Sequence, residues 1–178
     1  MLLALGVAMV AFDLALLLID RRLLVTGGPS ILGLEFAGNQ RGAARVMAEW
    51  GSHGRDLARL SLWIDFGFML SYGAFFALAA IATRDFARER DLRLLAAAGV
   101  ITPILAASAA LFDATENVLL LLTLGGHGGS LAPRLATACA SLKFLFIGLA
   151  IAYVIWGLLG RLMLRLRASE ASGPSRLP

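Results

Sequence analysis

The chain has 178 residues, of which 59% are hydrophobic and only 16% charged, and its mean hydropathy is +0.80. This composition excludes an average soluble domain and is typical of a helical membrane protein, with room for one domain of four spans. The net charge of +4 comes from arginines that flank apolar stretches. Such arginines anchor helix ends to lipid headgroups, and basic runs interleaved with aromatic residues are missing, so we expect membrane lipids as partners and no nucleic acid.

The first apolar run predicts a span over residues 1–20. It has no basic segment at its start and is interrupted by Asp13, so we expect a retained span and not a cleaved signal peptide. Asp13, Leu17 and Asp20 share one face of this helix. The turn-forming cluster Thr26–Ser30 then ends it.

The connection between the first two spans is the longest in the chain. Its apolar stretch Ile31–Phe36 suits the membrane interface. Asn39 can cap a short amphipathic helix over Gln40–Trp50, with Arg41 and Arg45 on its polar side. Two positions are open for this helix: on the membrane surface, which its arginines and tryptophan favour, or folded over the helix bundle.

Three further spans follow at about residues 59–83, 94–124 and 133–159. The sequence therefore predicts an all-α fold: a four-helix transmembrane bundle with a short amphipathic interfacial helix between spans one and two. We expect one membrane domain over residues 1–167 and a disordered tail over 168–178. Arginines are almost evenly divided between the two sides. Those in the short second connection and after span four favour both termini in the cytoplasm.

A polar group interrupts the third span. Asp113, Glu116 and Asn117 occupy positions i, i+3 and i+4, so they share one helical face. Ionisable residues in a spanning helix are costly and usually face the protein interior or a wet cavity. Asp65 and Tyr72 form a similar polar stripe on the second span.

Lys143 is the only lysine among sixteen basic residues, and it lies deep in the fourth span. A helical rise of ~1.5 Å per residue places the polar groups of all four spans roughly 9 to 15 Å from the same membrane side, with Tyr72 deeper. This agreement in depth predicts one polar pocket. We expect the Lys143 amine to face the bundle interior, within reach of Asp65, Asp113 or Glu116. The pocket candidates are Asp13, Asp65, Tyr72, Asp113, Glu116, Asn117 and Lys143.

The charges of this pocket are unbalanced. Four acids stand against one base, so some acids must carry a proton or must meet a cation or a ligand amine. Three uses remain open: a clamp that only fastens the helices, a pocket for a ligand or for catalysis, and an ion or proton path. No residue spacing supports a metal site with His53 or His127, and the single cysteine, Cys139, excludes a disulfide within the chain. We expect neither metal nor cofactor.

Three segments carry a resemblance: FAGNQRGAARVMAEW (Phe36–Trp50), WIDF with Tyr72 (Trp63–Phe66), and DATEN (Asp113–Asn117). Together they resemble a group of small bacterial four-span inner-membrane proteins of unknown function, over most of the chain. The general plan is also similar to the EXPERA group of sterol isomerases and sigma-2-like receptors, in architecture only. The resemblance implies no activity. Fifteen arginines against one lysine, with abundant Ala, Leu and Gly, indicate a GC-rich bacterial genome and hence the inner membrane. The polar pocket predicts a protein that binds or acts on a lipid-like small molecule, with a purely structural membrane protein as the alternative.

Overall fold

The computed structural model describes residues 1–171, with side chains through residue 167, and these residues form five helices and no strand. Four of the five helices are long and apolar enough to cross a membrane. The predicted all-α fold with four spans is therefore confirmed within the described part of the chain. The helices are α1 (Leu2–Val25), α2 (Ile31–Glu35), α3 (Gln40–Glu89), α4 (Arg93–Leu124) and α5 (Leu131–Ala171).

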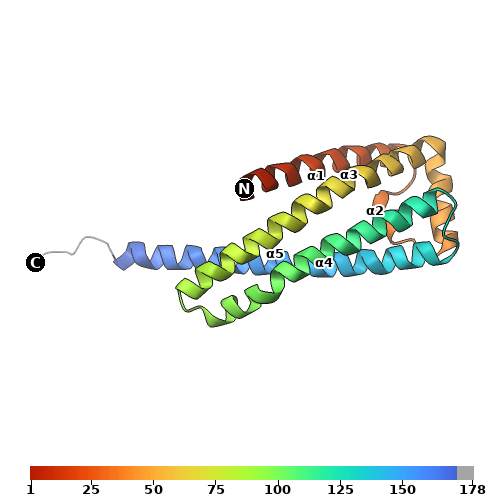
Figure 1. Ribbon diagram of the computed structural model, residues 1–178. Coiled ribbons are helices and arrows are strands. Elements are labelled where there is room, and N and C mark those ends of the chain that lie inside the picture. The colour runs from red at the N-terminus through yellow and green to blue at the C-terminus, as the bar shows by residue number, and fades with distance from the viewer. Residues whose placement is uncertain (172–178) are drawn as a thin grey trace, which may run out of the picture.

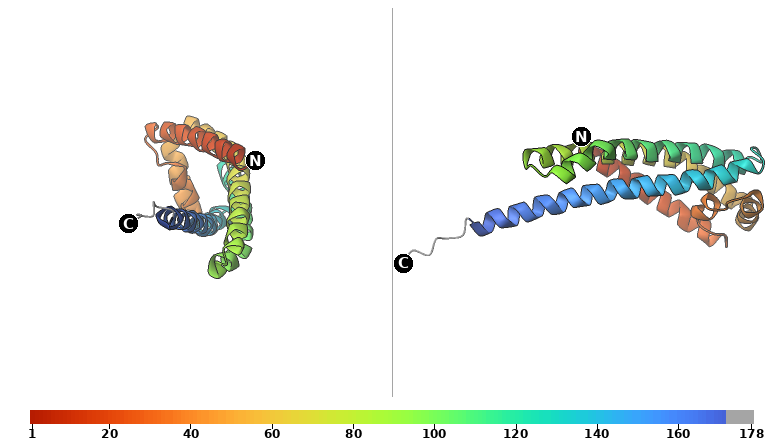
Figure 2. Two further views of the ribbon diagram at one scale, coloured as in Figure 1. Left: turned by 90° about the vertical axis from the view of Figure 1, so that its left-hand side faces the viewer. Right: turned by 90° about the horizontal axis from the view of Figure 1, so that it is seen from below.

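The four long helices do not pack in a closed ring. α4 packs along both α3 and α5, whereas α1 packs along α3 and makes no comparable contact with α5 among the described residues. Figure 1 shows α1 running alongside α3 and α5 running alongside α4. α1 and α5 therefore lie at opposite ends of this row of helices and do not pack along each other. α1 begins and α5 ends at the same end of the bundle, as four spans require. Seen along the bundle, the orange start of α3 crosses between α1 and α5 at the far end (Figure 2).

The helix expected over Gln40–Trp50 is not a separate element. It is the first arm of α3 and is joined to the second span through Gly51, whose φ of 63° and ψ of −162° bend the chain. A positive φ is open to glycine at little cost, because glycine has no Cβ. Asn39 caps the arm by accepting a 2.9 Å hydrogen bond from the Gly42 N–H, as the sequence predicts.

The apolar side of this arm is packed on the bundle. Trp50 is only 2% exposed and belongs to a core that includes residues of α1, α2 and α4. Its indole Nε1–H also donates a 2.7 Å hydrogen bond to the Pro29 carbonyl. Of the two positions that the sequence left open, the structure favours the arm folded over the bundle. Contact with the membrane interface stays a prediction.

Two spans are longer than hydropathy indicates. α1 continues past Asp20 to Val25, and α5 continues past Leu159 to Ala171. Hydropathy falls where arginines begin, but arginine is a good helix former and its long side chain reaches the headgroups, so the helix does not end there. The disordered tail expected for 168–178 is therefore helical as far as residue 171, and its remainder, 172–178, lies outside the described residues.

Glycine allows α1 to lie close to α3. A Cβ built on Gly67 of α3 would collide with the Phe12 ring of α1. Small residues at helix contacts are typical of membrane bundles, in which close van der Waals packing holds the helices together. Because α1 depends on α3 for its packing, this contact fixes the position of α1.

We predict that Gly67→Leu destabilises the fold by about 1–3 kcal/mol, the usual cost of adding bulk to a packed contact. The matched control is Gly148→Leu on α5, since nothing lies within 4 Å of a Cβ built there. Unfolding by SDS in mixed micelles, followed by tryptophan fluorescence, measures both variants. Equal stability of the two variants would contradict this packing of α1.

Candidate functional site

Lys143 is the centre of a buried ionic cluster. Its Nζ lies 2.9 Å from Asp113 Oδ1, 2.9 Å from Glu116 Oε2 and 3.5 Å from Glu35 Oε2. The lysine comes from α5, the first two acids from α4 and Glu35 from α2. The predicted contact of Lys143 with an acid in the bundle interior is confirmed, and the ammonium joins three helices.

The second span joins the cluster through two side chains. The Tyr72 hydroxyl donates a 2.9 Å hydrogen bond to Asp113 Oδ2, so Asp113 accepts from α3 and α5 at once. One helical turn after Asp113 on α4, Asn117 Nδ2 donates a 2.7 Å hydrogen bond to Asp65 Oδ2 on α3. The polar stripes predicted on the second and third spans therefore face each other.

Glu116 is the most deeply buried acid. It is 0% exposed, and neither of its carboxyl oxygens accepts a hydrogen bond from a described residue. Its contact with Lys143 is an ion pair without hydrogen-bond geometry. Because an isolated buried charge is very costly, the position of Glu116 depends on that ammonium.

Glu35 is a member of the cluster that the sequence analysis did not single out. The stretch Ile31–Phe36 was expected at the membrane interface, but α2 turns into the bundle and buries Leu34 and Glu35. A signal was present, since Glu35 is an acid within an apolar hexapeptide. Its reach to Lys143 is a tertiary contact that sequence spacing does not encode.

Three hydrogen bonds hold the segment around α2 in place. Asp20 Oδ1, in the second half of α1, accepts a 2.8 Å hydrogen bond from the Ile31 N–H, which satisfies a free donor at the start of α2. Thr137 on α5 donates to the Glu35 carbonyl at 2.7 Å and accepts from the Gly38 N–H at 3.1 Å. Glu35 is thus presented to Lys143 by contacts with two spans.

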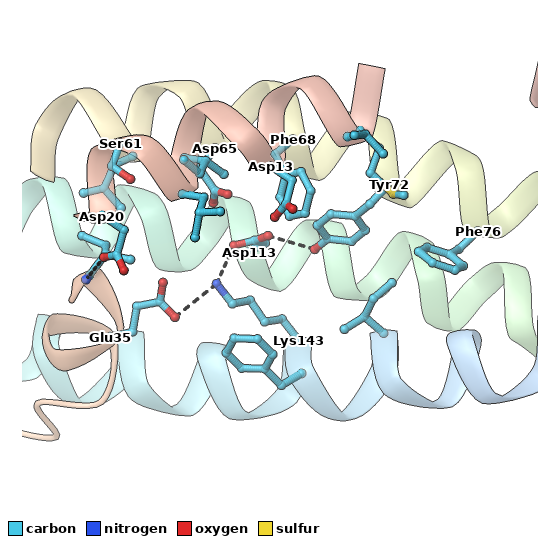
Figure 3. Close-up of a pocket in the computed structure, with 18 of the residues that line it drawn as sticks. Asp13, Asp20, Glu35, Ser61, Asp65, Phe68, Tyr72, Phe76, Asp113 and Lys143 are labelled. Carbon is cyan, nitrogen blue, oxygen red and sulfur yellow. Dashed lines mark hydrogen bonds and ion pairs between the residues drawn. The ribbon is translucent and has the colours of Figure 1, made fainter. Parts of the chain in front are cut away.

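The cluster forms one wall of a cavity of about 590 Å³. The cavity lies between α1, α3 and α5, and α2 and α4 also contribute to its lining. Figure 3 shows acidic side chains from several helices directed toward it, with Lys143 opposite Asp65 and Asp13. Most of the remaining lining is apolar; its apolar residues include Met9, Leu16, Phe68, Phe76, Phe144 and Ile147.

The predicted site residues take three different places. Asp65, Tyr72, Asp113 and Lys143 line the cavity. Glu116 and Asn117 are buried beside it and bind lining residues. Asp13 also lines the cavity, but it is exposed and lies at the rim. Asp20 and Glu35 complete the acidic lining.

Among residues 1–167, whose side chains the structure describes, no group of three histidine, cysteine or acidic side chains could hold a metal ion. The expected absence of a metal stays a prediction. None of three comparisons with known proteins, by family model, by curated sequence and by solved structure, gives a match. The fold therefore defines the class, a multi-pass helical membrane protein with a buried ionic cluster beside a cavity, and the resemblances drawn from the sequence stay predictions.

We predict that Lys143→Met lowers the free energy of unfolding by about 3–5 kcal/mol, because it leaves buried acids without their cation. Adding Glu116→Gln to Lys143→Met should restore part of that loss, since the two side chains are coupled. SDS unfolding of both single variants and of the double variant measures the coupling. Arg134→Gln, which removes an exposed cation from the same helix, is the control; a loss as large as that of Lys143→Met would contradict the special role of the buried lysine.

Proposed function

We propose that this multi-pass membrane protein binds a hydrophobic small molecule with a polar head, such as a lipid or an isoprenoid, in its intramembrane cavity. The observation that carries the proposal is the composition of the cavity wall. Apolar side chains line most of it, and a dense group of polar side chains lies at one part. This division suits an amphiphile, whose chain contacts the apolar wall while its head reaches the polar groups. The volume of about 590 Å³ falls within the range of about 300–1,000 Å³ that is usual for small-molecule sites.

A lateral opening supports a ligand that arrives from the bilayer. Residues that line the cavity from α1 and α5 are also substantially exposed: Leu17 is 45% and Phe144 46% exposed. Within the described chain, α1 and α5 do not pack along each other as α1 packs along α3. The cavity is thus partly open between them, along helices that would face lipid.

An acid of the cavity would act on such a ligand as a proton donor or as the partner of a ligand cation. We further propose that the chain resides in the bacterial inner membrane with both termini in the cytoplasm.

The second candidate is a structural or accessory membrane protein whose polar cluster only fastens the helices. The contact that favours it is the ammonium of Lys143, which already has three carboxyl partners from α2 and α4. This reading explains the cluster but gives no role to the cavity or to the exposed Asp13 at its rim.

Native mass spectrometry separates the two candidates. We expect the purified protein to carry an adduct with the mass of a lipid-like molecule. Leu17→Trp should lower the adduct fraction, because the larger side chain obstructs the opening. Leu18→Trp is the matched control: its neighbouring position on α1 is 60% exposed and does not line the cavity. Bare protein, or equal loss of adduct in both variants, would favour the structural candidate.

Reporter fusions test the orientation. A cytoplasmic reporter fused after Ala168 should be active, because the arginines of the second connection and of the chain after span four favour the cytoplasm. A reporter that functions only in the periplasm should be inactive at that position. Activity of the periplasmic reporter there would reverse the proposed topology.

A further inference from the structure

We infer that the ligand of this cavity is a long-chain amphiphile whose head is a hydrogen-bond-donating amine, held by Asp13 and Asp65. The inference rests on the proposed function, because it names the chemistry of the molecule that the cavity would bind. It follows from which polar groups of the cavity already have partners and which do not.

The donors at the cavity are already in use. The Lys143 ammonium faces three carboxyl groups, and its direct hydrogen bond goes to Asp113. The Tyr72 hydroxyl donates its single hydrogen to Asp113. Asn117 donates to Asp65 from behind the wall. Of the lining residues, only the Ser61 hydroxyl is left as a neutral group that could either donate or accept.

The acceptors, in contrast, are in excess. Five carboxyl groups line the cavity against one ammonium. Within the described chain, Asp65 is hydrogen-bonded through Oδ2 alone, and Asp13 has neither a hydrogen bond nor an ion pair. Glu35 is only 7% exposed, and its buried Oε2 accepts no hydrogen bond from a described residue. A phosphate or carboxylate head would bring more acceptors and more negative charge, so it does not fit.

Asp13 is the carboxyl group of the cavity that most needs a partner. It lies near the middle of α1, the most apolar of the four candidate spans, and it is exposed at the rim of the cavity. A carboxyl group at such a depth is costly unless it meets a partner. Figure 3 shows Asp13 and Asp65 projecting toward the same part of the cavity from two different helices. A cation between them would supply the missing charge.

An amine on a lipid chain satisfies these conditions better than a metal ion. No metal-binding group occurs among the described side chains of residues 1–167, and much of the cavity wall is apolar. An ammonium head donates charge-assisted hydrogen bonds, which are about twice as strong as neutral ones. Its chain would then contact the apolar side chains of α1 and α5 near the opening.

The experiment compares three ligands that share a sixteen-carbon chain: hexadecylamine, hexadecanol and hexadecanoate, each tritiated. Binding to the full chain in phosphatidylcholine nanodiscs is measured as the excess over empty nanodiscs, which corrects for partition into the bilayer. We expect the amine to bind about tenfold more tightly than the alcohol, because a hydrogen bond to a charged group contributes more than a neutral one. Hexadecanoate should bind most weakly.

Two variants test the assigned residues. Asp13→Asn should reduce the preference for the amine over the alcohol, and Asp13→Asn with Asp65→Asn should abolish it. Unchanged binding of hexadecanol shows that the cavity is still folded. Asp56→Asn is the control, because this acid is exposed, forms only a surface pair with Arg59 and does not line the cavity.

The outcomes separate this inference from the proposed function. Equal binding of amine and alcohol, a preference for hexadecanoate, or an amine preference that survives in the double variant would overturn the inference and leave the proposed function standing. If none of the three ligands binds above the level of empty nanodiscs, both fall.

Discussion

The burial of one ammonium among several carboxyl groups is the constraint on which this structure depends. Moving Lys143 away would leave buried carboxyl groups without a cation. Glu116 has no other partner in the described chain. Ion pairs in low dielectric add little net stability compared with apolar packing, but a broken pair is very costly. We therefore expect the cluster to select one register of α4 against α5 more than it adds to the stability of the fold. Tyr72 connects α3 to the same cluster through Asp113, and Glu35 connects α2 to it through Lys143.

The cavity depends on α1, the long helix that contributes no residue to the ionic cluster. Among the described residues, no ion pair or hydrogen bond joins α1 to Lys143. α1 is held mainly by its packing on α3, with the Phe12 ring packed against Gly67. A helix attached along one side leaves space toward α5, and the space remains because α2 and the first arm of α3 lie across the end of the bundle (Figure 1). The fold thus combines a buried ionic cluster with a cavity wall, α1, that packs mainly on one other span, an arrangement consistent with the proposed lateral entry of a ligand.

The spans and much of the polar cluster could be predicted from the sequence, because a lipid bilayer allows few backbone structures and few positions for charged residues. Long apolar runs must form helices in lipid, so the number and order of the spans follow from hydropathy alone. A charged residue inside such a run must face protein or water. For that reason the depth of Asp65, Asp113, Glu116 and Lys143 predicts one interior cluster, and the depth of Lys143 predicts its pairing with an acid.

Other features depend on contacts between helices, which the depth of a residue along its own helix does not predict. Glu35 belongs to a short stretch that is too brief to show a period, and only the turn of α2 into the bundle brings it to Lys143. The arm over Gln40–Trp50 carries arginines and a tryptophan that favour the headgroups, and only its packing against α1, α2 and α4 places it over the bundle. Asp13 has the right depth but a different environment, because α1 stands apart from α5. Sequence sets how far each polar group lies along its own helix, whereas the distances between helices, and hence the cavity, depend on how side chains of different helices pack.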